Sequence, residues 1–257
     1  MFRTFLYFFL NRIRGHGFAR MPGVQLLIRV LRRKTAVVHG FTIELDAEDS
    51  LGLSLFGTYE PEETALVESI VKPGQFVVDL GACIGYYTLL LSKLVGPTGR
   101  VIALEPAPDT CAILRRNIAR NGLTNITVVN AAAGESSRPG QLFLSQNRMD
   151  YHTESHAGGR SVPIDIIALD DYLQENVTID FVKMDIQGAE PVALRGMKCT
   201  LARSPSVRVL TEYWPDGIRR AGGDPQAFLE HLRSLGFETV GKLQGTAGSD
   251  YLYCTKG

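Results

Sequence analysis

The sequence predicts a doubly wound α/β fold with a mostly parallel sheet, and three observations support this prediction. Short apolar runs bounded by turn residues recur at 76–80, 100–104 and 126–129, as expected of buried parallel strands. Segments with helical periodicity at 86–95 and 108–121 alternate with these runs. The 257 residues are 45% hydrophobic, so the chain can bury the core of one large domain.

The other elements follow from the same reasoning. The segment 37–45 alternates around His39-Gly40 and predicts a short hairpin. Further strands are expected at 179–184 and 207–211, an antiparallel pair at 237–241 and 251–255, and helices at 61–71, 191–197 and 225–235. Residues 134–178 interrupt the alternation and predict an inserted hairpin, with strands at 142–144 and 162–167. We therefore expect a basic helical arm and hairpin over 1–50 and the main domain over 51–257.

The charge is unevenly distributed, although the formal net charge is +0. Residues 1–34 carry eight basic side chains and no acid, which leaves the rest of the chain acidic. This asymmetry predicts an arm that contacts an anionic membrane surface or packs on the acidic body of the same chain. The apolar stretch 5–10 is too short to span a bilayer, so a cytoplasmic protein with possible peripheral membrane contact is expected.

The four cysteines are widely separated and form no C-x-x-C pair, which predicts neither a redox couple nor a zinc site. The histidines of the insertion lack metal-ligand spacing, so no metal is expected. No nucleic-acid partner is expected, and the oligomeric state stays open.

The first predicted strand runs into Asp79, followed by a turn with Gly81 and Gly85. Nicotinamide dinucleotides prefer G-x-G-x-x-G, in which the second glycine admits the diphosphate. Here Cys83 and Tyr86 occupy the second and third glycine positions, and a side chain at Cys83 would obstruct the diphosphate. S-adenosylmethionine has no phosphate, so the looser turn suffices, with Asp79 accepting from its ammonium directly or through water.

The next two strand ends fit the same ligand. Glu105-Pro106 follows the second strand about 25 residues after Asp79, where an acid can bind both ribose hydroxyls. Asn130 and Ala131 follow the third strand and would leave room for adenine. These signals are weak singly, but together they predict S-adenosylmethionine as the cofactor.

The last two parallel strands carry the candidate chemistry. Asp185 follows the fourth strand, where a carboxylate could orient or deprotonate an attacking hydroxyl. Glu190 opens the next helix and either contacts the acceptor or only compensates the helix dipole. Glu212 and Trp214 follow the fifth strand and could line the acceptor pocket, although a Trp at the edge of the core is equally consistent.

The insertion contributes a polar loop that is a candidate for acceptor binding. Its polar side chains suit hydrogen bonding to a polyhydroxylated acceptor, and the alternative is a solvated surface loop. The candidate acceptor residues in it are Arg148, Tyr151 and His152.

Over residues 37–241 the chain resembles the FkbM-type methyltransferases. The resemblance rests on the segments 57–61, 72–74, 79–88, 96–99, 103–106 and 185–190, with Asn117 and Asn121-Gly122-Leu123. It implies a Rossmann-like class I methyltransferase fold, O-methylation of sugar or polyketide hydroxyls, and a place for Tyr59 and Glu60 near the cofactor. The resemblance also implies an acid at position 187, where this chain has Gln187, so a carboxylate there is not available and Gln187 is expected to hydrogen-bond the acceptor instead.

The sequence therefore predicts an S-adenosylmethionine-dependent O-methyltransferase of a glycan or related natural product. An NAD-dependent oxidoreductase and a non-catalytic partner subunit are the alternatives. The expected catalytic residues are Asp185, Glu212 and Gln187, and the expected cofactor residues are Tyr59, Glu60, Asp79, Gly81, Ala82, Gly85, Tyr86, Tyr87, Thr88, Glu105, Pro106, Asn130 and Ala131.

Overall fold

The computed structural model describes residues 33–144, 153, 160–245 and 249–256, in two compact units, 1–59 and 60–257. The first contains the hairpin β1 (Thr35–Val38) and β2 (Phe41–Glu44), followed by the short helix α3 (Leu53–Phe56). His39 and Gly40 both have positive φ, 54° and 90°, as a two-residue hairpin turn requires, so the predicted hairpin is confirmed. The predicted helices of the basic arm lie outside the described residues, and the unit boundary at 59/60 falls later than the predicted boundary at 50.

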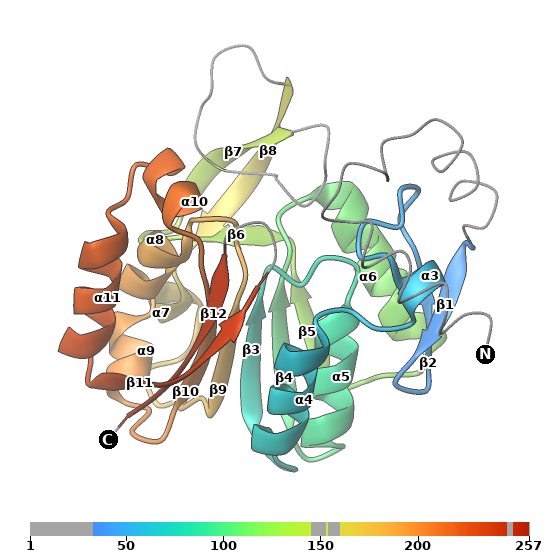
Figure 1. Cartoon of the computed structure of the whole chain (residues 1–257), viewed down its shortest axis with the longest axis horizontal. Helices are drawn as coiled ribbons and strands as arrows, with labels where there is room; N and C mark the ends of the chain where they lie inside the picture. The colour runs from blue at the N-terminus through green and yellow to red at the C-terminus, as the bar shows by residue number, and fades with distance from the viewer. Residues whose placement is uncertain (1–32, 145–152, 154–159, 246–248, 257) are drawn as a thin grey trace. The chain divides into compact units, whose positions relative to one another are not determined.

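The second unit is built on a seven-stranded sheet with the order β11-β12-β10-β9-β3-β4-β5 (Figure 1). Strand β3 pairs in parallel with β4 on one side and β9 on the other, so the strand order reverses at β3. Strand β12 is antiparallel to both of its neighbours. The doubly wound sheet and its antiparallel end are thus confirmed. The strands are β3 (Phe76–Leu80), β4 (Arg100–Leu104), β5 (Ile126–Val129), β9 (Phe181–Met184), β10 (Arg208–Tyr213), β11 (Phe237–Gln244) and β12 (Asp250–Lys256).

Helices cover both faces of this sheet (Figure 1). One face carries α4 (Pro61–Ile70), α5 (Tyr86–Val95) and α6 (Pro108–Arg120), with α5 against β3 and β4. The opposite face carries α7 (Leu169–Tyr172), α8 (Glu190–Arg195), α9 (Lys198–Ala202), α10 (Pro215–Arg220) and α11 (Pro225–Ser234). There, Val78 and Met184 of the strands join Leu194, Leu201 and Phe228 of the helices in the main apolar core. Within the described part of the chain, no helix is long and apolar enough to cross a membrane.

A second, three-stranded sheet has the order β6-β8-β7. Strands β7 (Arg138–Leu144) and β8 (Arg160–Ile167) form the predicted antiparallel hairpin, and β8 also pairs in parallel with β6 (Ala131–Ala133). The additional structure therefore begins at residue 131 rather than 134. Alanine has a low strand propensity, so the sequence does not predict a strand at 131–133. In the structure Ala132 packs against Leu142, Ile164 and Ile166 of the hairpin.

Candidate active site

Strand register explains which side chains meet at the carboxyl end of the large sheet. Asp79 on β3 is the direct neighbour of Lys183 on β9, so both side chains lie on the same face of the sheet. Glu212 on β10 is likewise paired with Tyr251 on β12. Ionisable residues from strands far apart in the sequence are therefore gathered at one rim, as ligand sites in doubly wound sheets generally are.

The glycine turn after β3 brings two strand ends into contact. Gly81 has φ 86°, and a Cβ atom at this position would lie 2.0 Å from the backbone oxygen of Asp185. Only glycine allows this approach, so Gly81 is required by packing within the protein as well as by the predicted ligand. Gly85, with φ 103°, precedes α5, whose first backbone N–H groups have no partner within the helix and are available for a ligand carboxylate.

Glu105, the predicted ribose-binding acid, is held by backbone donors. The N–H groups of Cys83 and Ala107 each donate to one of its carboxylate oxygens at 2.9 Å, which leaves further lone pairs for ligand hydroxyls. Burial raises the pKa of Glu105 to about 7, with the repulsion of Asp79 adding to the effect of burial. Asn130 donates its amide N–H groups to the backbone oxygens of Glu105 and Pro106, at 2.8 and 3.0 Å. These hydrogen bonds hold the Glu105-Pro106 segment in place. The predicted contacts of Asn130 and of buried Ala131 with adenine stay a prediction.

Asp79 is completely buried, with an exposed fraction of 0%. Its Oδ2 accepts from the Thr88 hydroxyl at 2.6 Å, whereas its buried Oδ1 has no hydrogen-bond partner among the described residues. Burial raises its pKa, against the attraction of Lys183 and the hydrogen bond from Thr88. An unsatisfied buried carboxylate oxygen needs a partner. The predicted contact of Asp79 with the cofactor ammonium, directly or through water, stays a prediction.

The two tyrosines at the start of α5 point toward α4. The Tyr86 hydroxyl lies 3.0 Å from the Thr64 hydroxyl, and the Tyr87 hydroxyl donates to Glu60 Oε2 at 3.1 Å. The predicted cofactor contacts of both tyrosines stay a prediction. Ala82, in the turn itself, is buried against α6. Tyr59 belongs to the first unit, so its place near the cofactor stays a prediction.

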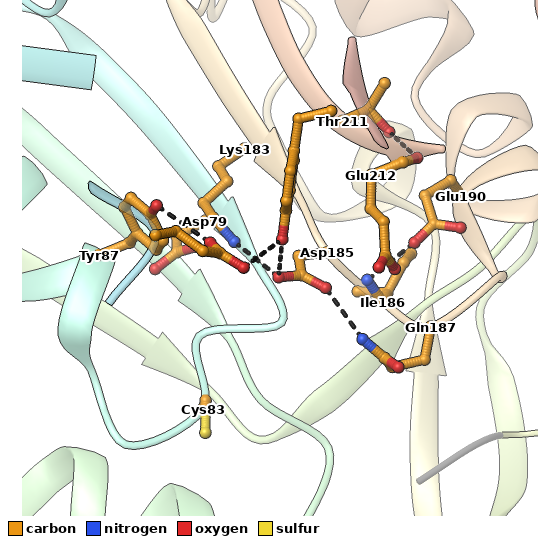
Figure 2. A network of polar contacts seen from close by, with 12 residues as sticks. Asp79, Cys83, Tyr87, Lys183, Asp185, Ile186, Gln187, Glu190, Thr211 and Glu212 are labelled. Atoms are coloured by element: carbon orange, nitrogen blue, oxygen red, sulfur yellow. Dashed lines mark hydrogen bonds and ion pairs between the residues drawn. The ribbon is translucent and has the colours of Figure 1, made fainter. Parts of the chain in front are cut away.

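Asp185 is held by three side chains. Its Oδ2 accepts from Lys183 Nζ at 3.2 Å and from the Tyr251 hydroxyl at 2.8 Å, and its Oδ1 accepts from Gln187 Nε2 at 3.0 Å. Figure 2 shows the Gln187 amide pointing toward Asp185 from the opposite side to Lys183. Gln187 adopts φ 60°, an unfavourable conformation for a residue with a side chain. Gln187 therefore orients Asp185, and its predicted bond to an acceptor stays a prediction.

Lys183 is the positive centre of this group and is only 2% exposed. Its ammonium lies 4.4 Å from the centre of the Tyr87 ring, where a cation–π attraction adds to the ion pair with Asp185. Burial by itself would lower the pKa of Lys183, but the nearby carboxylates of Asp185, Glu60 and Asp79 outweigh it, and the pKa lies above its ordinary value. Lys183 therefore stays charged at every pH of interest.

Two further acids lie beside Asp185 (Figure 2). Glu190, the first residue of α8, is fully buried and accepts from the Ile186 N–H at 2.9 Å. Glu212 is 7% exposed, and among the described residues neither its Oε2 nor Glu190 Oε2 has a hydrogen-bond partner. Burial and the repulsion of Asp185 raise the pKa of both above the ordinary glutamate value. Either carboxyl can therefore hold a proton at a pH where an ordinary glutamate would be ionised.

The comparisons with known proteins identify the family. Residues 79–239, more than half of the chain, match the family described as the methyltransferase FkbM domain. The chain belongs to the FkbM methyltransferase family. This match confirms the predicted resemblance. The FkbM domain of this chain is an S-adenosylmethionine-dependent methyltransferase domain, and S-adenosylmethionine is its cofactor.

Curated relatives share parts of this FkbM domain. Methyltransferase sdnD of Sordaria araneosa is 28% identical over 184 residues, covering 56% of this chain and 68% of that protein. Methyltransferase 1 of Beauveria bassiana is 27% identical over 145 residues, covering 48% and 58%. A protein-L-isoaspartate O-methyltransferase of Aeropyrum pernix is 37% identical over 68 residues, 26% of each chain. The chain thus spans between a quarter and about two thirds of the length of these relatives.

Two solved structures confirm the class I fold. The Streptococcus mutans protein SMU.1697c, in complex with SAH, has a TM-score of 0.51 and 12% identity, covering 77% of this chain and 97% of that one. A Clostridium thermocellum protein described as an rRNA-methylase has a TM-score of 0.52 and 12% identity, covering 77% and 96%. At this identity the likeness concerns the fold.

Of the predicted acceptor residues of the FkbM domain, only two lie in described segments. Glu190 is the buried first residue of α8. Trp214 immediately precedes α10, its ring lies over Gly217, and the Arg220 guanidinium lies 4.9 Å from the ring centre. That packing accounts for its position, and its contact with an acceptor stays a prediction. Arg148, Tyr151 and His152 lie outside the described residues.

Two members of the site, Lys183 and Tyr251, were not predicted. Lys183 could have been predicted from the sequence, because a lysine inside an otherwise apolar buried strand must be paired with a counter-charge. Tyr251 could not have been predicted in this way, because its place in the site depends on the pairing of β12 with β10.

Proposed function

We propose that this chain transfers the methyl group of S-adenosylmethionine to a hydroxyl oxygen of a sugar, glycan or related polyhydroxylated natural product. The observation that carries the proposal is the Asp185 carboxylate. It lies at the carboxyl end of β9, in backbone contact with the glycine turn, and three side chains fix its orientation. A carboxylate oriented in this way beside the cofactor turn suits the removal of a proton from an attacking hydroxyl.

When bound, S-adenosylmethionine supplies a methyl group on a positively charged sulfur. The chain then has to align the reactants and exclude water. The turn from Gly81 to Gly85, Asp79 and Glu105 would hold the cofactor, and the hydroxyl would approach from the side of Asp185. An ionised carboxylate has about four acceptor positions, and the three hydrogen bonds to Asp185 leave one on Oδ1 for the acceptor hydroxyl.

The electrostatics of the site favour an uncharged or cationic acceptor. Lys183 is paired with Asp185, and the other side chains gathered around this pair are acids, which offer no positive charge to an anionic acceptor such as a nucleic acid or a sugar phosphate. The acids in question are Glu60, Glu63, Asp79, Asp185, Glu190 and Glu212. The name of the Aeropyrum pernix relative, an O-methyltransferase, supports transfer to oxygen.

The proposal is tested in two stages. First, S-adenosylhomocysteine should raise the melting temperature and NAD should not, because a ligand stabilises only the protein that binds it. Second, a labelled-cofactor screen of neutral glycans and polyhydroxylated natural products should yield a methylated product whose label is on oxygen. Stabilisation by NAD alone would favour the oxidoreductase alternative. Cofactor binding without a product on any acceptor class would favour a non-catalytic partner subunit.

The basic arm supports a further proposal on location. The eight basic side chains of residues 1–34 would attract an anionic membrane surface. Full-length protein should then co-sediment with phosphatidylserine vesicles at low salt and be released at high salt. Equal recovery with neutral vesicles would contradict an electrostatic membrane contact.

A further inference from the structure

The turn that follows β9 presents the Gln187 side chain in a fixed direction. Gln187 and Gly188 both have positive φ, 60° and 97°, and a Cβ atom at Gly188 would lie 2.4 Å from the backbone of Gly217, so the turn packs closely on α10. The N–H group of Ile186, just before it, donates to the buried carboxylate of Glu190 at 2.9 Å. A residue with a side chain held at positive φ is costly and often marks a functional position.

The Gln187 amide lies on the outer side of Asp185. The exposed fraction rises from 2% for the Lys183 side chain to 9% for that of Asp185, and Gln187 is partly exposed. Figure 2 shows Lys183 and Gln187 on opposite sides of the Asp185 carboxylate. An acceptor that reaches this carboxylate from solvent therefore meets the Gln187 amide as well.

The amide group can bind Asp185 and a ligand at the same time. An ionised carboxylate only accepts hydrogen bonds, so the 3.0 Å contact with Asp185 Oδ1 is made by Nε2, and Gln187 Oε1 is left as an acceptor. Within the described segments Gln187 makes no other side-chain hydrogen bond. Amide covalent geometry and a hydrogen bond of this length place Oε1 and Asp185 Oδ1 about 4–5 Å apart. Two hydroxyl groups on adjacent carbons can each donate to one of two acceptors at that separation.

We propose that Asp185 and Gln187 together recognise a vicinal diol, so that the methylated hydroxyl has a second hydroxyl on the neighbouring carbon. This inference rests on the proposed function and narrows its acceptor class. The attacking hydroxyl donates to the remaining lone pair of Asp185 Oδ1, and the neighbouring hydroxyl donates to Gln187 Oε1. The two contacts fix the orientation of the diol against the carboxylate that is the proposed base.

The second contact makes Gln187 a specificity-determining residue. A partly exposed amide oxygen is hydrogen-bonded by water, and a bound acceptor displaces that water. An acceptor without the neighbouring hydroxyl leaves Oε1 unsatisfied, which is expected to lower kcat/KM by about 10- to 100-fold. A glutamate at this position would keep an acceptor oxygen but could not donate to Asp185.

The experiment uses matched pairs of neutral probes. The methyl pyranosides of glucose, mannose and galactose are assayed with labelled S-adenosylmethionine, each beside its monodeoxy counterparts. Wild-type protein should methylate at least one glycoside, and NMR of the product gives the methylated position. Removal of a hydroxyl on a carbon next to that position should lower kcat/KM by about 10- to 100-fold.

Two substitutions separate diol recognition from the positioning of Asp185. Gln187→Met removes both amide groups at nearly constant length, so the preference for the diol over the monodeoxy probe should disappear. Gln187→Glu keeps an acceptor oxygen and loses the donor to Asp185, so kcat should fall while the diol preference is retained. If Gln187 only positioned Asp185, both probes would lose rate equally and the preference would persist in both variants. Gln174→Met, at an exposed position after α7, is the control and should match wild type.

An unchanged diol preference in Gln187→Met would overturn the inference. So would equal rates for a glycoside and its deoxy counterparts with wild-type protein, a comparison that holds even if the variant does not fold. Absence of label from every glycoside while S-adenosylhomocysteine binds would overturn it as well. Methylation of hydroxyls without the preference leaves the proposed function standing, whereas absence of S-adenosylhomocysteine binding, or label on an atom other than oxygen, contradicts the proposed function itself.

Discussion

The two halves of the sheet rim hold their carboxylates in different ways. In the cofactor half, formed by β3, β4 and β5, Glu105 is fixed by backbone N–H groups from residues close to it in the chain or in the adjoining turn. In the acceptor half, formed by β9, β10 and β12, Asp185 is fixed by side chains, one of which is 66 residues away in the sequence. Backbone donors place a ligand site that varies little with side-chain composition. Side-chain donors place a site that substitution can change.

The largest effect is expected in the acceptor half. Asp185→Asn should lower methyl transfer by about 10²- to 10⁴-fold, the usual contribution of a positioned base. The affinity for S-adenosylhomocysteine should stay within about twofold, because the backbone turn is unchanged. Turnover is measured with labelled cofactor and the acceptor found by screening, and Asp165→Asn, at an exposed position of β8, is the matched control. Near wild-type turnover would show that Asp185 is not the base and that the two halves of the rim do not differ in this way.

In the cofactor half, Glu105→Gln should act on cofactor affinity, whereas Asp185→Asn acts on turnover. Loss of a charged acceptor for the ribose hydroxyls costs about 1.5–3 kcal/mol, which is roughly a 10- to 100-fold loss of affinity for S-adenosylhomocysteine. Hydroxyl donors favour the ionised carboxylate, so wild-type affinity should weaken as pH falls through the pKa of about 7, and the variant should be nearly independent of pH. Calorimetry from pH 5.5 to 8.5 checks both expectations, with exposed Glu135→Gln as control. A pH-independent wild type would show that Glu105 does not bind the ribose.

Thr88→Val, also in the cofactor half, tests the stability of the folded protein rather than its activity. Among the described residues, Thr88 makes the one hydrogen bond to the buried carboxylate of Asp79, so its loss should lower the free energy of unfolding by about 1–3 kcal/mol. For a domain of this size each 1 kcal/mol corresponds to a fall of roughly 2–4 °C in melting temperature. Exposed Thr98→Val should leave the melting temperature unchanged. Equal melting temperatures for both variants would indicate that Asp79 is satisfied by other means.

The smallest effect is a gain in stability in the acceptor half. The pKa of Glu212 is raised by burial and by Asp185, so its proton is bound more tightly in the folded state than in the unfolded state. Its favourable contribution is complete below about pH 4.5 and is lost as the pH rises through the raised pKa. Glu212→Gln should therefore melt about 2–4 °C above wild type at pH 8. The difference should vanish near pH 4, with exposed Glu238→Gln as control. A lower melting temperature at pH 8 would mean that the ionised Glu212 is favourably paired.

The same contrast explains what could be predicted from the sequence. The strand ends and the turn with Asp79, Gly81 and Glu105 were predicted because their signals are local: an apolar run, a glycine spacing and an acid one strand–helix–strand unit later. Asp185 was found by the same logic. Tyr251 could not be found, because nothing near it in the chain indicates that β12 inserts between β10 and β11. Gln187 was expected to contact the acceptor, and only the structure shows that it orients Asp185.

The contact between Gly81 and the Asp185 carbonyl has a mechanical consequence. With no side chain between them, the cofactor turn cannot shift toward β9 without displacing the main chain that carries the proposed base. A larger side chain at position 81 would therefore displace both the turn and the main chain at Asp185.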